Sequence, residues 1–483
     1  MSIGDLEDDQ ITGEGSNQSE NGDTSNEMME VDECNVKNEV YIPGRSRPLE
    51  DDEELIMDKS AYRMFFELEV EYSSLSFDIL TDNMGSDRCV EVNGGAHSAC
   101  MIAGTQASQG SQNKLIVMKL CNMIPFKRKD STDEGQSSSE DESDSDEENL
   151  DAQPDVEAAT ILHQGTVNRV RAKQQKGRYL AASWSENGMV FIWDLTRPLT
   201  AVNDSAVMAE YTRHDESPSP LFTFKGHKTE GFALDWSSHT NAVGHLVTGD
   251  CNGCIYYWKP RSSDWAVSKR PFTAHTNSVE DIQWSPTEPT VFISVSSDRS
   301  IRVWDVRVPQ CNGSVLSVPE AHSADINVAS WSHLKPINLL TGGDDGTLKI
   351  WDLRLIHSNG PQKSKGSSIR AYTHLFDYHK KPITSVEWHP NDAGVFVATC
   401  EDDQASFWDI TLEQSEQDVK QSTSESGTSH ETTGGDDLDI PVQLLFIHSG
   451  QKELKEAHWH PQIPGLVFTT SLDGYNVFRT CNI

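Results

Sequence analysis

The hydrophobic positions of this chain recur with one period over its C-terminal two thirds. Short runs of two-residue alternation, such as 301–304 and 348–351, end on a tryptophan, and a histidine lies 29 to 31 residues before each closing aromatic. The six pairs are His163–Trp193, His227–Trp258, His275–Trp304, His322–Trp351, His379–Trp408 and His448–Phe478. Such alternation is typical of strands that bury one face. The period therefore predicts six copies of one small sheet.

A second set of tryptophans lies inside these units, 19 to 22 residues before the closing aromatic. Its members are Trp236, Trp284, Trp331, Trp388 and Trp459. Units of ~40–45 residues with two such registers are typical of four-stranded propeller blades. The chain resembles the WD-repeat β-propellers, whose characteristic Trp-Asp dipeptide begins here at Trp193, Trp304, Trp351 and Trp408.

Polar residues recur at a fixed place within the units. Asp298, Asp345 and Asp402 lie six residues before the closing tryptophan, where two other units have Asn187 and Asn252 and the last has Leu472. The resemblance implies that the aspartate binds the histidine of its repeat, which contacts a Ser or Thr and then the tryptophan. Because this set repeats in several units, we interpret it as a structural network and not as acid–base chemistry. The network of the last unit is in doubt.

The N-terminal part completes the ring. Strand-like runs at 75–80, 99–103 and 115–120 predict a seventh blade, with strands shared between the two ends of the chain. Residues 40–74 precede the propeller at 75–483, and an amphipathic helix over 51–72 is expected to lie against its side. The apolar positions of that helix are Leu55, Ile56, Tyr62, Phe65, Phe66, Leu68 and Tyr72. The predicted fold is all-β, a seven-bladed WD-repeat propeller with this helix and disordered acidic segments.

The formal charge of −37 is concentrated in three ranges, 1–39, 130–151 and 411–439. Together they contain 31 acidic residues and two lysines, and they almost lack aromatic residues. Such segments cannot bury enough apolar surface to fold, so we expect an acidic N-terminal tail and two disordered acidic insertions. Acidic tails promote solubility, and they also attract basic partners. The sequence leaves both interpretations open.

Other classes of function find little support. The candidates for a basic stripe are short, namely Phe126-Lys-Arg-Lys129, a weak candidate for nuclear import, and Arg169, Arg171, Lys173, Lys176 and Arg178. Direct nucleic-acid binding is therefore not expected. No apolar run of signal-peptide or membrane-spanning length occurs, and the nine cysteines form no disulfide pattern, so a soluble intracellular protein is expected. Cys251 and Cys254 fall where a tight turn is expected. We predict no enzyme, cofactor or metal site.

A closer resemblance rests on local motifs outside the acidic ranges. These are Tyr41-Ile-Pro-Gly-Arg45, Glu53-Glu-Leu-Ile-Met-Asp58, Leu75-Ser-Phe-Asp-Ile79, Ala103-Gly-Thr-Gln106, Glu230-Gly-Phe-Ala-Leu-Asp-Trp236, Ser278-Val-Glu-Asp-Ile-Gln-Trp284, Gly342-Gly-Asp-Asp-Gly346 and Gln443-Leu-Leu-Phe-Ile-His448. With them the chain is similar to the glutamate-rich WD-repeat proteins. That resemblance implies a nuclear and nucleolar role in large ribosomal subunit biogenesis, as a chaperone of a ribosomal protein of the large subunit, together with histone binding and contact with pre-ribosomal particles.

The chain also resembles the broader group of histone-binding WD-repeat proteins. That group holds a basic helix between an N-terminal helix and an acidic loop, which here correspond to 51–72 and 436–441, with Pro441-Val442 in place of the usual two prolines. The client-site hypothesis consists of Leu55, Tyr62, Phe65, Phe66, Asp436, Asp437 and Asp439. The competing interpretation is that these aromatics pack on the propeller and the loop has no role.

An alternative function is substrate receptor of a cullin-type ubiquitin ligase. Such receptors end blades with Trp-Asp-x-Arg, and this chain has two such endings, at Arg307 and Arg354, which would contact the ligase adaptor. A separate feature of the 130–151 range bears on regulation. Ser137, Ser138, Ser139, Ser143 and Ser145 each have a carboxylate three residues on, the pattern that acidophilic kinases prefer.

Overall fold

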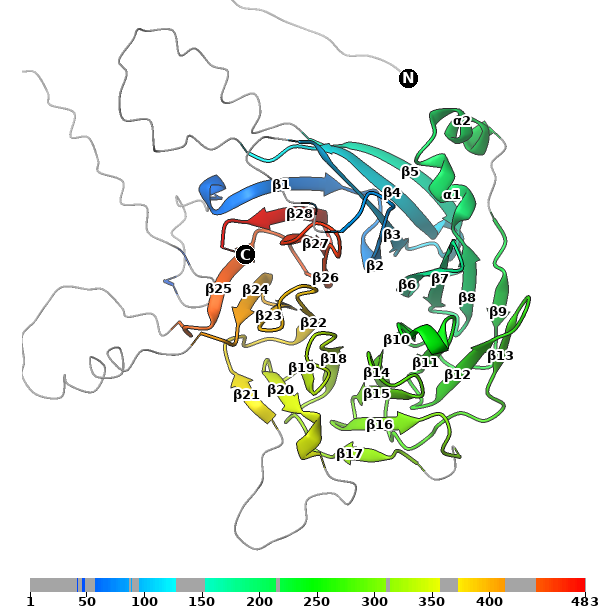
Figure 1. Cartoon of the computed structure of the whole chain (residues 1–483), viewed down its shortest axis with the longest axis vertical. Helices are drawn as coiled ribbons and strands as arrows, with labels where there is room; N and C mark the ends of the chain where they lie inside the picture. Colours follow the sequence, from blue (N-terminus) through cyan, green and yellow to red (C-terminus); the bar gives the residue numbers. More distant parts are fainter. Residues whose placement is uncertain are drawn as a thin grey trace, which may run out of the picture. The chain divides into compact units, whose positions relative to one another are not determined.

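The computed structural model describes residues 41, 46–47, 57–86, 88, 95–126, 153–213, 218–309, 313–356, 372–412 and 440–482. In these ranges, the unit that begins at Arg47 is a propeller of seven four-stranded antiparallel sheets (Figure 1). The predicted all-β seven-bladed fold is confirmed. The acidic stretches predicted to be disordered, 1–39, 130–151 and 411–439, lie outside the described residues except for Thr411 and Leu412.

We number the blades along the chain and name the strands of each from the centre outward. Blade one has β2 (Ser74–Leu80), β3 (His97–Thr105), β4 (Lys114–Met123) and β5 (Asp155–Leu162). Blade two has β6 (Val167–Gln175), β7 (Arg178–Ser185), β8 (Val190–Asp194) and β9 (Phe222–Phe224). Blade three has β10 (Ala233–Trp236), β11 (Leu246–Gly249), β12 (Ile255–Pro260) and β13 (Trp265–Val267).

The next three blades follow the same order. Blade four has β14 (Val279–Trp284), β15 (Val291–Ser296), β16 (Ile301–Asp305) and β17 (Leu316–Val318). Blade five has β18 (Ile326–Trp331), β19 (Asn338–Gly343), β20 (Leu348–Asp352) and β21 (Tyr372–Phe376). Blade six has β22 (Ile383–Trp388), β23 (Val395–Cys400), β24 (Gln404–Asp409) and β25 (Leu444–Ser449).

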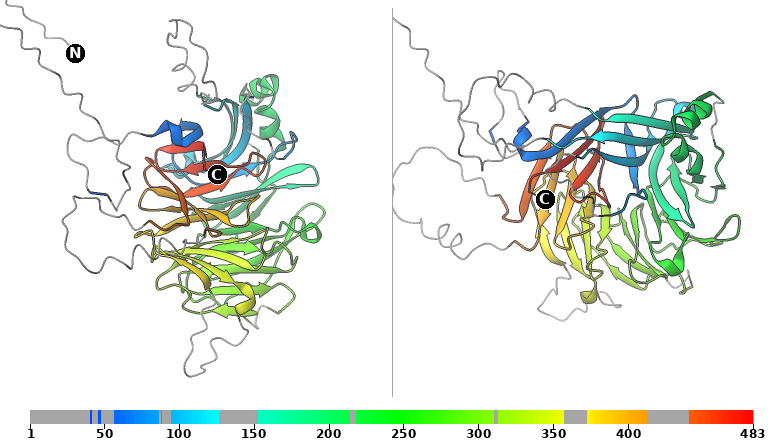
Figure 2. Two further views of the ribbon diagram at one scale, coloured as in Figure 1. Left: turned by 60° about the vertical axis from the view of Figure 1, so that its left-hand side comes forward. Right: turned by 45° about the horizontal axis from the view of Figure 1, so that its top comes forward.

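The seventh or closing blade joins the two ends of the chain. Its inner strands are β26 (Glu456–Trp459), β27 (Leu466–Thr470) and β28 (Gly474–Thr480), and its outer strand is β1 (Tyr62–Glu69). Strand β1 pairs antiparallel with β28 from Tyr62↔Thr480 to Glu69↔Gly474 (Figure 2, blue beside red). The predicted sharing of strands between the ends is confirmed, and it leaves no blade one strand short.

The helix predicted over 51–72 is wrong for the described part of that range. Residues 62–69 form β1, preceded by a short 3-10 turn, η1 (Lys59–Ala61). The reason is visible in the burial pattern, because Tyr62, Met64 and Phe66 are buried and alternate with less buried residues, as in a strand. The seven apolar positions of 51–72 fit both the periodicity of an amphipathic helix and that of a half-buried strand. The strand forms because β28 offers a free edge with which β1 can pair. Leu55 and Ile56 lie outside the described residues.

Helical structure is confined to connections in the described residues. Helices α1 (Thr196–Ala201) and α2 (Ser205–Arg213) join β8 to β9, and Tyr211 of α2 donates to the Thr160 carbonyl of β5 at 2.7 Å. Other 3-10 turns are η2 (Gly110–Gln112), η3 (Thr240–Ala242) and η5 (Leu353–Leu355). None of these helices is long and apolar enough to cross a membrane.

The repeat tryptophans and histidines are bonded to one another through a hydroxyl in blades two to six. In blade four, His275 Nδ1 lies 2.9 Å from Asp298, His275 Nε2 lies 2.6 Å from the Ser294 hydroxyl, and Trp304 Nε1 donates to that hydroxyl at 2.8 Å. Burial lowers the pKa of His275, which favours the neutral ring that this chain of bonds requires. Blades five and six repeat the arrangement around His322 and His379. The predicted network is confirmed there.

Two blades use other partners than the sequence indicated. In blade three, His227 binds Asp250 at 2.8 Å, two residues before the Asn252 that occupies the expected position. In blade two, His163 Nδ1 lies 2.8 Å from the Gly165 carbonyl and not beside Asn187. The side chains of Asn252 and Asn187 carry no charge that would attract the histidine. Each histidine therefore binds a nearby carboxylate or carbonyl oxygen instead.

The closing blade departs furthest from the pattern. His448 lies within β25, where its Nδ1 is 2.8 Å from the Tyr62 hydroxyl. The histidine position of the repeat belongs instead to Gln451, which accepts from Thr469 and donates to Ser471 at 3.0 Å. The assignment of His448 as the sixth repeat histidine is therefore wrong. The turn between β27 and β28 is one residue shorter than the corresponding turn of blade four, which puts Asp473 and not Leu472 at the aspartate position. The spacing of His448 from Phe478 matches the other units only by coincidence.

Candidate functional site

The three acidic ranges attach to three consecutive blades. Residues 127–152 connect β4 to β5 in blade one, 413–439 connect β24 to β25 in blade six, and 1–56 precede β1 in the closing blade. One apolar cluster joins these attachment points, because Phe126, Phe65 of β1 and Leu445 and Phe446 of β25 all pack against the same buried core, which includes Tyr62. The Phe126 amide also donates to the Arg63 carbonyl at 2.8 Å. We call this cluster the closing edge.

The propeller absorbs most of the aromatics that were predicted to contact a client, Tyr62 and Phe65 in the closing edge and Phe66 in the neighbouring core cluster with Phe77. Tyr62 is 6% exposed and Phe66 is 2% exposed, while Phe65 is half-buried, with its ring 5.3 Å from that of Tyr62. The buried pair holds β1 in the propeller, so their side chains serve the fold. Met57, Leu412, Ile440 and Val442 are exposed apolar residues next to the ends of the acidic ranges. Leu55, Asp436, Asp437 and Asp439 lie outside the described residues, as do Ser137, Ser138, Ser139, Ser143 and Ser145.

The two candidate adaptor arginines have the same local geometry in blades four and five. Arg307 makes two bonds to the Asp305 carboxylate, at 3.0 and 2.6 Å, and Arg354 makes two to Asp352, at 2.9 and 2.5 Å. Both guanidiniums remain largely exposed, at 71% and 68% of the side chain. The preceding carboxylate thus fixes each arginine in place and leaves one side of it open to a partner.

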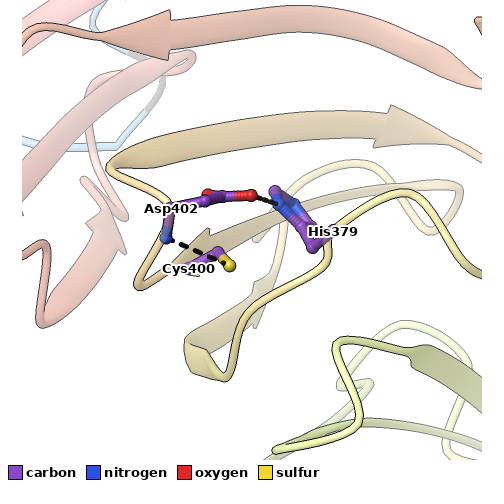
Figure 3. Close-up of side chains that lie close together, drawn as sticks. All are labelled: His379, Cys400 and Asp402. Atoms are coloured by element: carbon purple, nitrogen blue, oxygen red, sulfur yellow. Dashed lines mark hydrogen bonds and ion pairs between the residues drawn. The ribbon is translucent and has the colours of Figure 1, made fainter. Parts of the chain in front are cut away.

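A cluster of His379, Cys400 and Asp402 has the composition of a metal or nucleophilic site (Figure 3). Its groups are already used, because His379 Nδ1 is 2.8 Å from Asp402, its Nε2 is 2.8 Å from Ser406, and the Cys400 thiol donates to the Lys381 carbonyl at 3.2 Å. Burial also raises the pKa of Cys400, which disfavours the thiolate that a metal or a nucleophile needs. The cluster is the blade-six copy of the repeat network.

The only Cys-x-x-Cys sequence has an equally structural explanation. Cys251 and Cys254 lie in the turn between β11 and β12, which Gly253 closes with φ 76°. Asp250 accepts from the Asn252 and Cys254 amides at 3.0 and 2.9 Å, which fixes the turn. Both thiols are free, and burial raises the pKa of each. The predicted turn is confirmed.

The innermost strands bring buried charges together in the centre of the ring. Glu456 of β26 forms ion pairs with Arg169 and with Arg171 of β6, the latter at 3.0 Å. His458 lies 2.6 Å from Glu387 of β22 and 3.4 Å from Glu456. We call these five residues the central ion cluster. Two residues of the candidate basic stripe, Arg169 and Arg171, therefore form ion pairs within the protein.

The pKa shifts in the central ion cluster follow from its charges. Burial alone would raise the pKa of Glu456, but Arg171 and Arg169 hold it well below its usual range. Burial alone would lower the pKa of His458, but Glu387 and Glu456 raise it to about 9. These shifts favour an ionised Glu456 and a protonated His458 at neutral pH, and the cluster joins blades two, six and seven. Sequence reasoning missed this cluster, because its members lie up to 287 positions apart.

Comparisons with known proteins agree with this architecture. A family model described as histone-binding protein RBBP4 or a component of the CAF1 complex matches residues 52–124, which span β1 to β4. A model described as WD domain, G-beta repeat matches 218–259, 267–305, 313–352 and 370–409. Each of these four matches begins near the outer strand of one blade and ends in the third strand of the next.

Three curated proteins are similar over most of their length. Protein HEAT STRESS TOLERANT DWD 1 of Arabidopsis thaliana is 41% identical, over 93% of this chain and 92% of its own. Ribosome assembly protein rrb1 of Schizosaccharomyces pombe is 39% identical, over 91% and 84%. Glutamate-rich WD repeat-containing protein 1 of Dictyostelium discoideum is 39% identical, over 90% and 83%.

Proposed function

Because this chain belongs to the family of glutamate-rich WD-repeat-containing proteins, we propose that it is a non-enzymatic scaffold that chaperones strongly basic proteins during ribosome assembly. The clients in this proposal are a ribosomal protein of the large subunit and histones, bound in the nucleus and nucleolus and delivered to pre-ribosomal particles. The Schizosaccharomyces pombe relative is named a ribosome assembly protein, which supports the role with ribosomal proteins. The histone-binding family model over 52–124 supports histones as clients.

The observation that carries the proposal is the strand order, which attaches the two acidic insertions to blades one and six, on either side of the closing blade that the N-terminal acidic range precedes. The 31 acidic residues counted above attach to blades six, seven and one, next to exposed Met57, Ile440 and Val442. A basic client meets there a high local density of carboxylates and a small apolar surface. The negative charge of the carboxylates speeds the association of a basic client and selects it over acidic proteins, and apolar contact slows its dissociation. With Tyr62 and Phe66 buried, the proposed client residues are Leu55, Phe65, Asp436, Asp437 and Asp439.

The test removes charge next to the closing edge without changing shape. In the variant D436N/D437N/D439N we expect about tenfold weaker binding of purified large-subunit ribosomal proteins or of histones, and a flatter dependence on salt. A matched control, E320Q/D344N/D377N, removes three carboxylates from blade five and its flanking loops. Titrations at low and high salt measure both quantities. Equal affinity and equal salt slope in the first variant and wild type would place the client elsewhere, and equal losses in both variants would mean that only net charge matters.

Phosphorylation of the 130–151 range would strengthen the same attraction. Each phosphate on Ser137, Ser138, Ser139, Ser143 or Ser145 adds about −1.5 to −2 charge. We expect faster association with basic clients at low salt, with little change in dissociation. Stopped-flow kinetics of phosphorylated and unphosphorylated chains give both rates, and identical association rates would support a role in solubility alone.

The second candidate function is substrate receptor of a cullin-type ubiquitin ligase. Its structural support is the pair of exposed arginines Arg307 and Arg354, each held by a neighbouring carboxylate. The Arabidopsis relative also carries the term DWD in its name. We expect R307A/R354A to abolish co-purification of the ligase adaptor while leaving client binding unchanged. Failure of the wild-type chain to retain the adaptor would remove this candidate and leave the first intact.

A further inference from the structure

One end of blade five carries exposed apolar side chains that the fold does not use. Leu334 and Ile337, in the loop between β18 and β19, are 48% and 37% exposed, and Leu355 at the end of η5 is 40% exposed. The Leu353 amide donates to the Ile337 carbonyl at 2.9 Å, which ties the loop to η5. We call Leu334, Lys335, Ile337, Arg354 and Leu355 the blade-five edge. Strands β18 to β20, which carry it, are labelled in Figure 1.

The loop of the blade-five edge is held in one conformation. The Lys335 amide donates to Ser332 at 3.0 Å, the Asn338 amide donates to the Lys335 carbonyl at 2.8 Å, and Trp331 Nε1 donates to the Pro336 carbonyl at 2.8 Å. The last bond is unusual for this molecule, because the corresponding indoles of blades four and six donate to the preceding blade instead. In blade five the indole fixes its own loop, so the exposed leucine and isoleucine are presented on a rigid base.

The blade-five edge is also basic in a strongly acidic chain. Lys335 and Arg354 are exposed, and the nearby Asp352 carboxylate is buried and already bound to Arg354. The range 357–371, which connects η5 to β21, contains Lys363, Lys365 and Arg370 and no acidic residue. The ranges that attach to the closing edge are instead rich in Asp and Glu and contain almost no Lys or Arg. A partner of the blade-five edge must therefore differ in charge from a basic client.

Blade four provides an internal comparison. Arg307 has the same geometry as Arg354, but the loop between β14 and β15 carries Glu288, whose charge acts on Arg307, in place of exposed leucine or isoleucine. The loop beside Arg354 thus presents exposed apolar side chains and the additional cation Lys335, whereas the loop beside Arg307 presents the additional carboxylate Glu288. Isolated exposed apolar residues need no explanation, whereas a fixed group of them flanked by cations indicates a contact surface.

We propose that the blade-five edge is a docking surface for an acidic amphipathic segment of a partner protein. Leucine-type side chains of the segment would pack on Leu334, Ile337 and Leu355, and its carboxylates would pair with Arg354 and Lys335. Arg354 suits this role because Asp352 already orients its guanidinium. Three apolar side chains form a small interface, so we expect a transient complex with a Kd on the order of 10–100 µM. This surface is independent of the proposed basic client.

The test uses a defined probe and the full chain. The probe is a labelled synthetic helix with leucines at i, i+3, i+4 and i+7 and glutamates elsewhere, and its matched control has lysines in place of the glutamates. Fluorescence polarisation should show binding of the acidic helix that L334S/L355S weakens at least about tenfold and R354A about fivefold. The matched controls R307A and V243S, on other blades, should leave the affinity unchanged.

Three results would overturn the proposal. The first is no binding of the acidic helix up to about 1 mM, and the second is an equal loss of affinity in R307A and R354A. The third is binding that appears only after residues 130–151 are deleted, which would assign the blade-five edge to an acidic segment of the same chain. Circular dichroism and urea unfolding of each variant ensure that a loss of affinity reports on the surface and not on the fold.

Discussion

In blade four, the histidine, aspartate, serine and tryptophan of the repeat come from one stretch of 30 residues, 275–304, and the four strands follow one another in the chain. The closing blade takes the corresponding residues from 451–478, but its outer strand β1 comes from the other end of the chain. There Gln451 and Asp473 replace the histidine and the aspartate, Phe478 replaces the tryptophan, and Tyr62 of β1 is bound to His448. The comparison shows which part of the repeat a blade requires. A buried polar core must be fully hydrogen-bonded, but the side chains that achieve this can change.

The largest expected effect comes from removing the strand that only the closing blade borrows. Deletion of residues 1–69 removes β1 and exposes the faces that Tyr62, Met64 and Phe66 cover. We expect a loss of more than about 5 kcal/mol, enough to abolish cooperative unfolding in most domains. Urea unfolding followed by tryptophan fluorescence measures it. Deletion of residues 1–40 is the control and should leave the unfolding transition in place. A cooperative transition in the 1–69 deletion would show that six complete blades and the three remaining strands of the closing blade suffice.

The next effect concerns the charges that join the closing blade to blades two and six. The variant E456Q leaves Arg169 and Arg171 buried without a full counter-charge, and we expect a loss of about 3–5 kcal/mol. Because the pKa of Glu456 lies below its unfolded value, its contribution is present above pH ~4.5 and is lost as pH falls further. E456Q should therefore lose much of the acid sensitivity of the wild type. The control E453Q, which removes an exposed carboxylate, should change stability by less than about 0.5 kcal/mol.

The same comparison shows what the sequence can and cannot reveal. The repeat period predicted six blades, and the family resemblance implied the Asp298–His275 type of network; both could be read because they depend on residues close in sequence. The amphipathic pattern of 51–72 was assigned to a helix, since nothing in that stretch identifies β28, some 410 residues later, as its partner. Glu456 and its arginines were missed for the same reason. Composition gave the acidic ranges, but only the strand order shows that they attach to consecutive blades.

A third effect depends on pH in the opposite direction. The pKa of His458 is raised to about 9 in the folded protein, so its stabilising charge is complete below pH ~6.5 and is lost as pH rises toward 9. We expect the wild type to lose up to about 3 kcal/mol over this window. H458Q should be less stable at pH 6 and should lose little of its remaining stability by pH 9. Parallel slopes for the two proteins in urea titrations would show that His458 is not charged in the cluster.

A regular blade should tolerate loss of its histidine poorly. In H275Q, the amide cannot reach Asp298 and Ser294 together with the geometry of the ring, so at least one buried partner loses its bond. We expect a loss of about 1–3 kcal/mol, measured by urea unfolding at pH 7. H239Q, on the loop that follows β10, serves as the control for a histidine outside the network. A change below about 0.5 kcal/mol in H275Q would contradict the structural role of the repeat histidine.

The reciprocal change, Q451H, should have the smallest effect. It places the repeat histidine in the closing blade, where Thr469 and Asp473 already occupy the positions of its usual partners. The new ring can bind both, but Ser471 loses the amide that donates to it at 3.0 Å, so gain and loss nearly cancel. We expect a change within about 1 kcal/mol of wild type, in either direction, under the conditions used for H275Q. A loss of about 3 kcal/mol or more would mean that the closing blade has been built around the amide, and that its departure from the repeat is a requirement of joining two chain ends.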